Sequence, residues 1–231
     1  MRYGAVIFDL FGALVDNITP DDYRRTLGEM ADAVGADRQA FIDLWRDDEV
    51  VLKRATGFFA ASEQTVQYIC ERLGVAAGAE RVARAAQMRL DAHGQWLFPR
   101  PDAVDTLRQL RRLPLKLGLM SVASGDVPLL WPGSPLAPFF DEALFSSRVG
   151  LTKPDPRFYA LACDRLGVPP GRCLYVGDGD GNELTGARQA GMHPVLICAP
   201  HEADIVLGRQ EARNWRGPKI TALRQVLDLL A

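Results

Sequence analysis

Four residues of this chain combine the side chains that phosphoryl chemistry needs: Asp9, Ser121, Lys153 and Asp178. Asp9 directly follows the apolar run 5–8, and it precedes a turn that contains glycine. In an open sheet of parallel strands, the carboxyl ends of the strands lie at one edge, so residues far apart in the sequence converge there. A carboxylate can attack phosphorus, while a hydroxyl and an ammonium group stabilise the oxygens on which charge accumulates. These residue types therefore predict phosphoryl transfer with Asp9 as the nucleophile.

The same set of residues predicts a magnesium site. Mg²⁺ binds through one or two carboxylates and keeps several of its waters, and Asp9 and Asp178 suit that preference. The ion also reduces the repulsion between an anionic nucleophile and an anionic phosphate. We therefore expect Mg²⁺ as the cofactor.

The elements that must position these residues have the pattern of an α/β fold with a doubly wound parallel sheet. The run 5–8 is apolar without alternation, which is typical of a strand that is buried on both faces. Strand patterns recur later in the chain and alternate with helical patterns, as in a parallel sheet. We expect strands at 5–8, 115–120, 143–145, 173–176 and 195–198, and helices at 101–112, 155–166, 182–190 and 221–230.

The segment between the first strand and residue 98 has a different character. Four helical patterns follow one another without a strand, and three of them end at a glycine, which favours a helix C-terminus. They cover 22–34, 38–53, 62–73 and 79–92. We therefore expect a four-helix cap formed by residues 17–98, inserted into a core formed by 1–16 and 99–231.

Composition limits the partners of the chain. Of its 231 residues, 48% are hydrophobic, and the net charge of −2 gives no reason to expect nucleic acid binding. No apolar run approaches the ~18 residues of a membrane span, and the first run ends too early for a secretory signal. The four cysteines show no paired spacing, so we expect reduced thiols. These features predict a cytoplasmic protein that binds neither nucleic acid nor a membrane. We expect a monomer or homodimer, and the site residues above suggest a small phosphorylated molecule as its partner.

Four segments of the chain together resemble one family. They are FDLFGAL at 8–14, GLMS at 118–121, KPDPRFY at 153–159 and YVGDGDGNELTGA at 175–187. Their order and spacing resemble the haloacid dehalogenase superfamily, in subfamily I with a helical C1-type cap after the first core strand. The resemblance implies that Asp9 is the nucleophile and a metal ligand, that Ser121 and Lys153 bind the transferred group, and that Asp178 completes the metal site. Glu183 is then expected to orient Lys153 or a metal-bound water.

The chain departs from the phosphatases of this family at positions that bear on the reaction. Phe11 stands where they usually carry an aspartate that acts as general acid and base, although its backbone carbonyl can still bind Mg²⁺. Ala13 replaces the usual threonine, and Val122 replaces a polar residue. We expect Phe11, Gly12, Ser121, Val122 and Lys153 to line the substrate site.

These departures leave several functions open. The first is a Mg²⁺-dependent phosphatase that acts on a small phosphorylated metabolite. The second is a metal-free 2-haloacid dehalogenase, because the family's dehalogenases also have an aromatic residue at the position of Phe11; the segment Gly177-Asp178 favours the phosphatase. The others are a different C–P or phosphoryl-transfer reaction, including a Schiff base on Lys53, and a weakly active or non-enzymatic relative that acts by binding.

Residues outside the four segments are expected to be structural. We expect His93, His193 and His201 at the surface or as helix caps. In the predicted cap, segment 53–59 is the one expected to approach the substrate. Tryptophans 45, 96 and 131 are expected to pack in the core or between cap and core.

Overall fold

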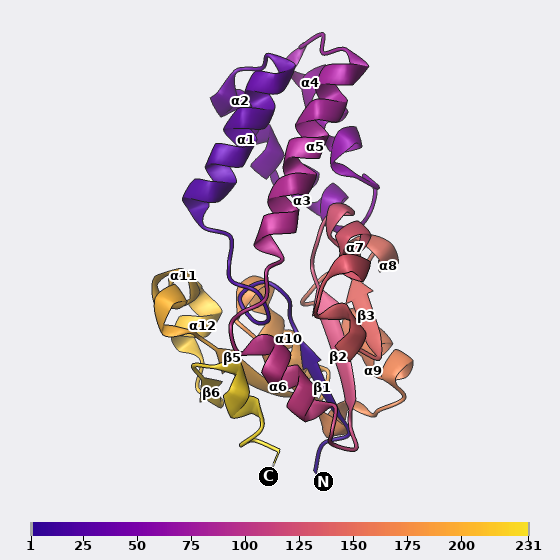
Figure 1. Ribbon diagram of the computed structural model, residues 1–231, viewed down its shortest axis with the longest axis vertical. Helices are drawn as coiled ribbons and strands as arrows, with labels where there is room; N and C mark the ends of the chain where they lie inside the picture. Colours follow the sequence, from indigo (N-terminus) through magenta and orange to yellow (C-terminus); the bar gives the residue numbers. More distant parts are fainter. Residues whose placement is uncertain (1, 231) are drawn as a thin grey trace.

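A computed structural model describes residues 2–230, and at its centre lies a parallel sheet of six strands. The strand order is β3-β2-β1-β4-β5-β6 (Figure 1). The strands are β1 (Ala5–Phe8), β2 (Lys116–Ser121), β3 (Glu142–Phe145), β4 (Cys173–Gly177), β5 (His193–Ile197) and β6 (Lys219–Ile220). The predicted α/β class with a doubly wound parallel sheet is confirmed. Because the strand order reverses beside β1, that edge of the sheet is where such folds place their binding sites.

Both faces of the sheet are covered. Ile7 belongs to an apolar cluster with helices α9 and α10, whereas Phe8 belongs to a cluster with α6 and the C-terminal segment. Adjacent residues of a strand point to opposite faces, so the unbroken apolar run of β1 fills both clusters. The helices around the sheet are α6 (Ala103–Leu110), α7 (Asp126–Leu130), α8 (Ser146–Val149), α9 (Pro156–Leu166), α10 (Glu183–Gln189), α11 (Ala203–Gly208) and α12 (Gln210–Asn214).

Five further helices stand beyond the carboxyl edge of the sheet (Figure 1). They are α1 (Pro20–Val34), α2 (Arg38–Arg46), α3 (Asp48–Ala55), α4 (Ser62–Leu73) and α5 (Ala79–Trp96), and they enclose an apolar cluster of their own. We call these five helices the cap and the sheet with its helices the core. The chain boundaries at 16/17 and 98/99 stay a prediction.

The cap has five helices because the segment predicted as a single helix over 38–53 is divided. Asp47 ends α2, and its side chain accepts hydrogen bonds from the backbone N–H groups of Glu49 and Val50. An aspartate with non-helical backbone angles at that place is a favourable helix N-cap, so a new helix begins there. The apolar pattern runs through both helices, which is why the sequence alone suggested one.

The C-terminal prediction was wrong as well. Instead of one helix over 221–230, the chain forms the short strand β6, which was not expected, and a 3-10 helix over Leu223–Val226. The side-chain oxygen of Gln225 accepts hydrogen bonds from the backbone N–H groups of Thr221 and Ala222, at 2.7 and 3.2 Å. These bonds fix a turn at the point where a longer helix would have to begin.

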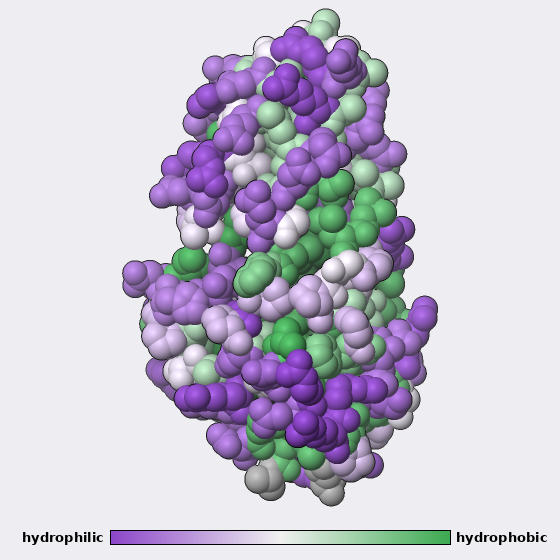
Figure 2. Space-filling view, viewed as in Figure 1, coloured by the Kyte–Doolittle hydropathy of each residue, from purple (hydrophilic) through white to green (hydrophobic). Residues whose placement is uncertain are grey.

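The cap meets the core through closely packed backbone. A Cβ atom on Gly57 would lie 2.0 Å from the carbonyl oxygen of Ser147, and one on Gly125 would lie 1.9 Å from that of Ala60. The face shown in Figure 2 has hydrophobic side chains gathered at this level, between two largely hydrophilic ends. Within residues 2–230, no helix has the length and apolarity that a bilayer span requires.

Candidate active site

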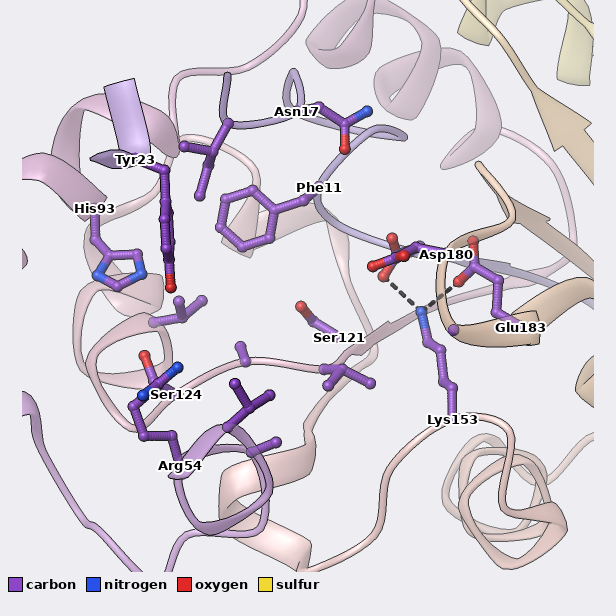
Figure 3. A pocket seen from close by; sticks show the side chains of 18 of the residues that line it. Phe11, Asn17, Tyr23, Arg54, His93, Ser121, Ser124, Lys153, Asp180 and Glu183 are labelled. Atoms are coloured by element: carbon purple, nitrogen blue, oxygen red, sulfur yellow. Dashed lines mark hydrogen bonds and ion pairs between the residues drawn. The ribbon is translucent and has the colours of Figure 1, made fainter. Parts of the chain in front are cut away.

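Lys153 joins two carboxylates at the carboxyl edge of the sheet. Its Nζ lies 2.6 Å from Asp9 Oδ1 and 2.6 Å from Glu183 Oε2, and Figure 3 draws both ion pairs. Asp9 directly follows β1, Lys153 lies in the loop before α9, and Glu183 begins α10. All three side chains are buried. The structure therefore brings together three residues that the sequence analysis selected from distant segments.

Glu183 is held by the core as well as by Lys153. Its Oε2 accepts a hydrogen bond of 2.6 Å from the Tyr175 hydroxyl, and its Oε1 accepts one of 3.0 Å from the Gly179 backbone N–H. Tyr175 lies inside β4, and its hydroxyl reaches the strand end from within the sheet. A carboxylate fixed at both oxygens can hold the Lys153 ammonium in one position.

Asp178, directly after β4, is completely buried beside this group. Its Oδ2 accepts a hydrogen bond of 3.0 Å from Asn17 Nδ2, and it forms an ion pair with the Arg209 guanidinium. Gly12 has a φ of 77°, and a Cβ atom there would lie 1.7 Å from Asp178 Oδ2. A residue without a side chain is therefore required at position 12, so Gly12 contributes space and backbone to the site.

Asp9, Asp178 and Glu183 form a cluster of carboxylates that fits a divalent cation. Each offers an oxygen, and the three oxygens lie within 4.8 Å of one another. Burial raises the pKa of Asp9 to about 8, with Glu183 and Asp178 adding to the effect and the Lys153 ammonium opposing it. Burial also raises the pKa of Asp178. The three carboxylates face two cations, Lys153 and Arg209, so one negative charge is left over, and hard oxygen ligands with excess negative charge suit Mg²⁺.

Ser121, the last residue of β2, has a buried hydroxyl that forms no hydrogen bond with any described residue. It borders the same cavity as Asp9 and Lys153. An unpaired buried hydroxyl costs free energy unless a ligand or water satisfies it. The side chain of Val122, 40% exposed, and that of Phe11 border the cavity as well. Of the five residues expected to line the substrate site, Phe11, Ser121, Val122 and Lys153 border the cavity and Gly12 does not, and their roles stay predictions.

The cavity has a volume of about 410 Å³ and lies between core and cap. Its cap side includes Tyr23 on α1, Arg54 on α3, and Arg89 and His93 on α5. The expectation of a surface or capping role for His93 was wrong. Its side chain is buried, 3.7 Å from Asp126 Oδ2, and burial lowers its pKa well below 6.5, with the charge of Arg89 adding to the effect.

Lys53 lies apart from the cavity lining. Its Nζ pairs with Glu49 Oε1 at 2.6 Å and lies 4.7 Å from the centre of the Tyr68 ring. The neighbouring Arg54 is the member of segment 53–59 with a charge that reaches the cavity. These contacts leave the Schiff base on Lys53 without support from the structure.

Several residues of the site carried no signal in the sequence. Arg209 lies in the C-terminal region between α11 and α12, outside the four segments, and Asn17 follows the first segment without a pattern of its own. Arg89 and His93 are four residues apart on α5, which places them on one face of the helix. That spacing alone does not say which face of α5 meets the core.

The sequence of the chain is similar to that of known hydrolases. Residues 3–191 match the family model of haloacid dehalogenase-like hydrolases. A glyceraldehyde 3-phosphate phosphatase of Methanopyrus kandleri is 30% identical over 198 residues, which cover 84% of this chain and 83% of the relative. An (S)-2-haloacid dehalogenase of Pseudomonas sp. strain YL is 27% identical over 232 residues, which cover 97% and 93% of the two chains.

A solved structure has the same fold over nearly the whole length of this chain. It is an L-2-haloacid dehalogenase of Xanthobacter autotrophicus with chloropropionic acid covalently bound. The TM-score is 0.65, and the alignment covers 99% of this chain and 98% of the other at 21% identity. At this level of identity the likeness shows the fold.

Proposed function

The chain belongs to the haloacid dehalogenase-like hydrolases, and we propose that it is a Mg²⁺-dependent phosphatase of a small phosphorylated metabolite. The observation that carries this proposal is the convergence of Asp9, Asp178 and Glu183 around one point, with Lys153 beside them. A nucleophilic carboxylate with two acidic neighbours is poorly ionised unless a cation compensates them. The similarity to a phosphatase of Methanopyrus kandleri is consistent with this function.

In the proposed reaction, an oxygen of Asp9 attacks phosphorus while the bond from phosphorus to the substrate's ester oxygen breaks. The alcohol leaves, and an aspartyl-phosphate remains on Asp9. Water then attacks the same phosphorus, the bond to Asp9 breaks, and inorganic phosphate and the free carboxylate result. Lys153 and the Ser121 hydroxyl bind the oxygens on phosphorus in both steps, which satisfies the hydroxyl that has no partner among the described residues.

Asp9, Asp178 and the backbone carbonyl of Phe11 would hold the metal ion. When bound, Mg²⁺ supplies the charge compensation that lets an anionic carboxylate approach an anionic phosphate. The Glu183 carboxylate keeps Lys153 in place through their ion pair. Because Phe11 cannot donate a proton, the leaving oxygen has to take its proton from water, and substrates with good leaving groups should react best.

Metal-free dehalogenation of a 2-haloacid is the second candidate, and two observations favour it. The Phe11 side chain lines the cavity beside the nucleophile, and Arg209 pairs with Asp178, so this carboxylate already has a cationic partner within the protein. In this reaction Asp9 displaces halide from carbon, and water hydrolyses the resulting ester. The similarity to a dehalogenase of Pseudomonas is consistent with it.

Two assays distinguish the candidates. We expect hydrolysis of p-nitrophenyl phosphate that requires Mg²⁺ and is abolished by EDTA, and no chloride release from 2-chloropropionate. Asp9→Asn should lower the rate by about 10⁴-fold or more, as removal of a nucleophile does, whereas Asp164→Asn, on the exposed side of α9, serves as the matched control. Chloride release that EDTA does not affect would refute the phosphatase. No Asp9-dependent turnover in either assay, or with a panel of phosphorylated metabolites, would favour the binding protein.

A further inference from the structure

We propose that the cap side of the cavity binds a carboxylate of the substrate, so that the substrate is a phosphate monoester with a carboxylate at the end remote from phosphorus. The inference rests on the proposed phosphatase for its reaction. It adds the chemical class of the substrate, and it comes from two buried arginines that the catalytic steps leave unused.

Arg54 and Arg89 face the cavity from two different cap helices. They are 8% and 5% exposed. Aromatic rings hold both guanidinium groups: the centre of Arg54 lies 4.6 Å from the Trp45 ring, and that of Arg89 lies 4.7 Å from the Tyr23 ring and 4.8 Å from the Trp96 ring. Contacts with ring faces stabilise the charge without using the N–H groups of the guanidinium.

The N–H groups of Arg89 are incompletely used. Its Nε and Nη1 are buried and have no hydrogen-bond partner within residues 2–230. Arg54 donates from Nη1 to the Trp45 carbonyl oxygen at 2.8 Å. A buried guanidinium with free donors costs free energy, and the bidentate fit of an oxyanion offsets that cost.

The balance of charge around the two arginines calls for one more negative charge. Asp126 is the carboxylate whose charge acts on both of them, and its oxygens accept hydrogen bonds from Ser62 and Ser124. His93 is neutral in this surrounding because burial and the charge of Arg89 lower its pKa. Two guanidinium groups and one carboxylate leave a single excess positive charge, which a carboxylate matches and a phosphate dianion exceeds.

The Lys153 ammonium and the guanidinium of Arg54 lie at opposite sides of the same cavity (Figure 3). Lys153 and Glu183 are on one side, Tyr23, Arg54 and His93 are on the other, and Phe11 and Ser121 lie between them. A substrate with its phosphate at Lys153 and its carboxylate at the arginines would therefore lay its carbon chain along the Phe11 ring. The cavity volume of about 410 Å³ suits a metabolite of that size.

Matched pairs of substrates test this inference. The acids are the phosphate esters of hydroxyacetic, 3-hydroxypropanoic and 4-hydroxybutanoic acid, and each is compared with its methyl ester. We expect kcat/KM for the acid of the best length to exceed that for its methyl ester by about 10- to 100-fold, chiefly through KM, as for a hydrogen bond to a charged group. The same series with a second phosphate in place of the carboxylate should be poorer.

Arginine variants show which side chains produce the preference for the acid over its methyl ester. Arg89→Gln and Arg54→Gln should each bring the ratio of acid to methyl ester close to one, and Arg89→Lys should restore part of it by keeping the charge. Arg84→Gln, at an exposed position of the same helix, should keep the ratio of the unsubstituted protein. Thermal unfolding of each variant shows whether it is folded. An equal preference for acid and methyl ester in the unsubstituted protein overturns the inference, as does a preference for the bisphosphate.

Calorimetric titration of Asp9→Asn with the same esters, in the presence of Mg²⁺, separates this inference from the proposed function. If the unsubstituted protein hydrolyses neither these esters nor p-nitrophenyl phosphate nor the panel of phosphorylated metabolites, the proposed phosphatase fails. Tighter binding of the acids than of their methyl esters, lost in the double variant with Arg89→Gln, then still supports the carboxylate site. Binding that does not distinguish acid from ester overturns the site whatever the activity.

Discussion

The core side and the cap side of the cavity both contain buried charges, but the two sides satisfy them differently. On the core side, Lys153 lies between two carboxylates at 2.6 Å, and Glu183 is fixed at both oxygens. On the cap side, aromatic rings hold Arg54 and Arg89, and donors of Arg89 have no partner among the described residues. The charged side chains of the core side are therefore held by the protein itself, although the Ser121 hydroxyl there has no partner among the described residues, whereas on the cap side a charged group itself lacks partners.

This difference separates reaction from recognition. Side chains that are fixed by the protein itself suit a transition state, because they need no rearrangement when charge develops. Side chains that gain partners only from the ligand suit selection among substrates. We therefore expect core substitutions to change turnover of every substrate and cap substitutions to change the preference between substrates.

Among these substitutions, Lys153→Met should have the largest effect, and the effect should fall on the core side. It removes the cation between Asp9 and Glu183, so we expect kcat to fall by about 10²–10³-fold with every phosphate ester. Two buried carboxylates also lose their partner, which should cost about 3–5 kcal/mol of the free energy of unfolding. Steady-state kinetics and urea denaturation measure the two effects, with Lys219→Met at an exposed residue of β6 as control. A fall in activity of less than tenfold would show that Lys153 is not part of the reacting side.

Phe11→Asp should add what the core side lacks. A carboxyl group two residues after Asp9 can protonate the leaving oxygen, so we expect hydrolysis of alkyl phosphates to rise by about 10–100-fold, part of the ~10²–10⁴ typical of general acid–base catalysis. Hydrolysis of p-nitrophenyl phosphate should change little because its leaving group needs no proton. Phe11→Asn is the matched control, because asparagine has nearly the same shape as aspartate but cannot act as an acid. An equal gain in both variants would mean that space near the nucleophile, and not a proton, limits the rate.

The pH dependence of stability should report on the core side through the buried Asp9 carboxyl. The pKa of Asp9 in the folded protein is raised to about 8, above its value in the unfolded chain. Between these two values the folded protein binds more protons, so the free energy of unfolding falls as pH rises from 5 to 8 and levels off above that. We expect this decline in EDTA, measured by urea denaturation, to be smaller in Asp9→Asn and in the presence of Mg²⁺. Parallel curves for Asp9→Asn and the unsubstituted protein would show that Asp9 is ionised throughout this range.

Tyr23→Phe should have the smallest effect, and its kinetic effect should be confined to recognition by the cap side. The Tyr23 hydroxyl accepts a hydrogen bond of 3.1 Å from Trp45 Nε1, and its ring lies under Arg89. We expect a loss of about 1 kcal/mol in the free energy of unfolding and a change of about 2- to 10-fold in the preference for the carboxylate ester. Tyr68→Phe, whose hydroxyl accepts from Arg72 outside the cavity, is the control. An equal loss of kcat with all esters would mean that the two sides are not separable.

The core side could be predicted from the sequence because strand ends are easy to locate. An apolar run followed by a polar residue fixes both the strand and its end, so Asp9, Ser121 and Asp178 could be placed at one edge before their contacts were known. The role of Tyr175 could not be predicted in this way, because its hydroxyl reaches Glu183 from inside β4 and not from the strand end. Arg209 escaped it because it comes from a connection between short helices that has no periodic pattern.

The cap side was harder to predict because its charged residues contradict the usual preference for the surface. An arginine or histidine on an amphipathic helix is normally assigned to the solvent face. Arg89 and His93 are buried instead, and Arg89 lies against Tyr23, whose contribution depends on how α1 packs against α5. Such a pairing between helices has no spacing that the sequence displays.

The backbone contacts at Gly57 and Gly125 have a consequence for how this enzyme can diversify. Main-chain atoms of cap and core meet there, so the height of the cavity is set by parts of the chain that every residue type shares. Residues on the inner faces of α1, α3 and α5 can then be exchanged without altering the distance between cap and core. Substrate range and the spacing between cap and core can therefore evolve independently, as long as these two positions remain glycine.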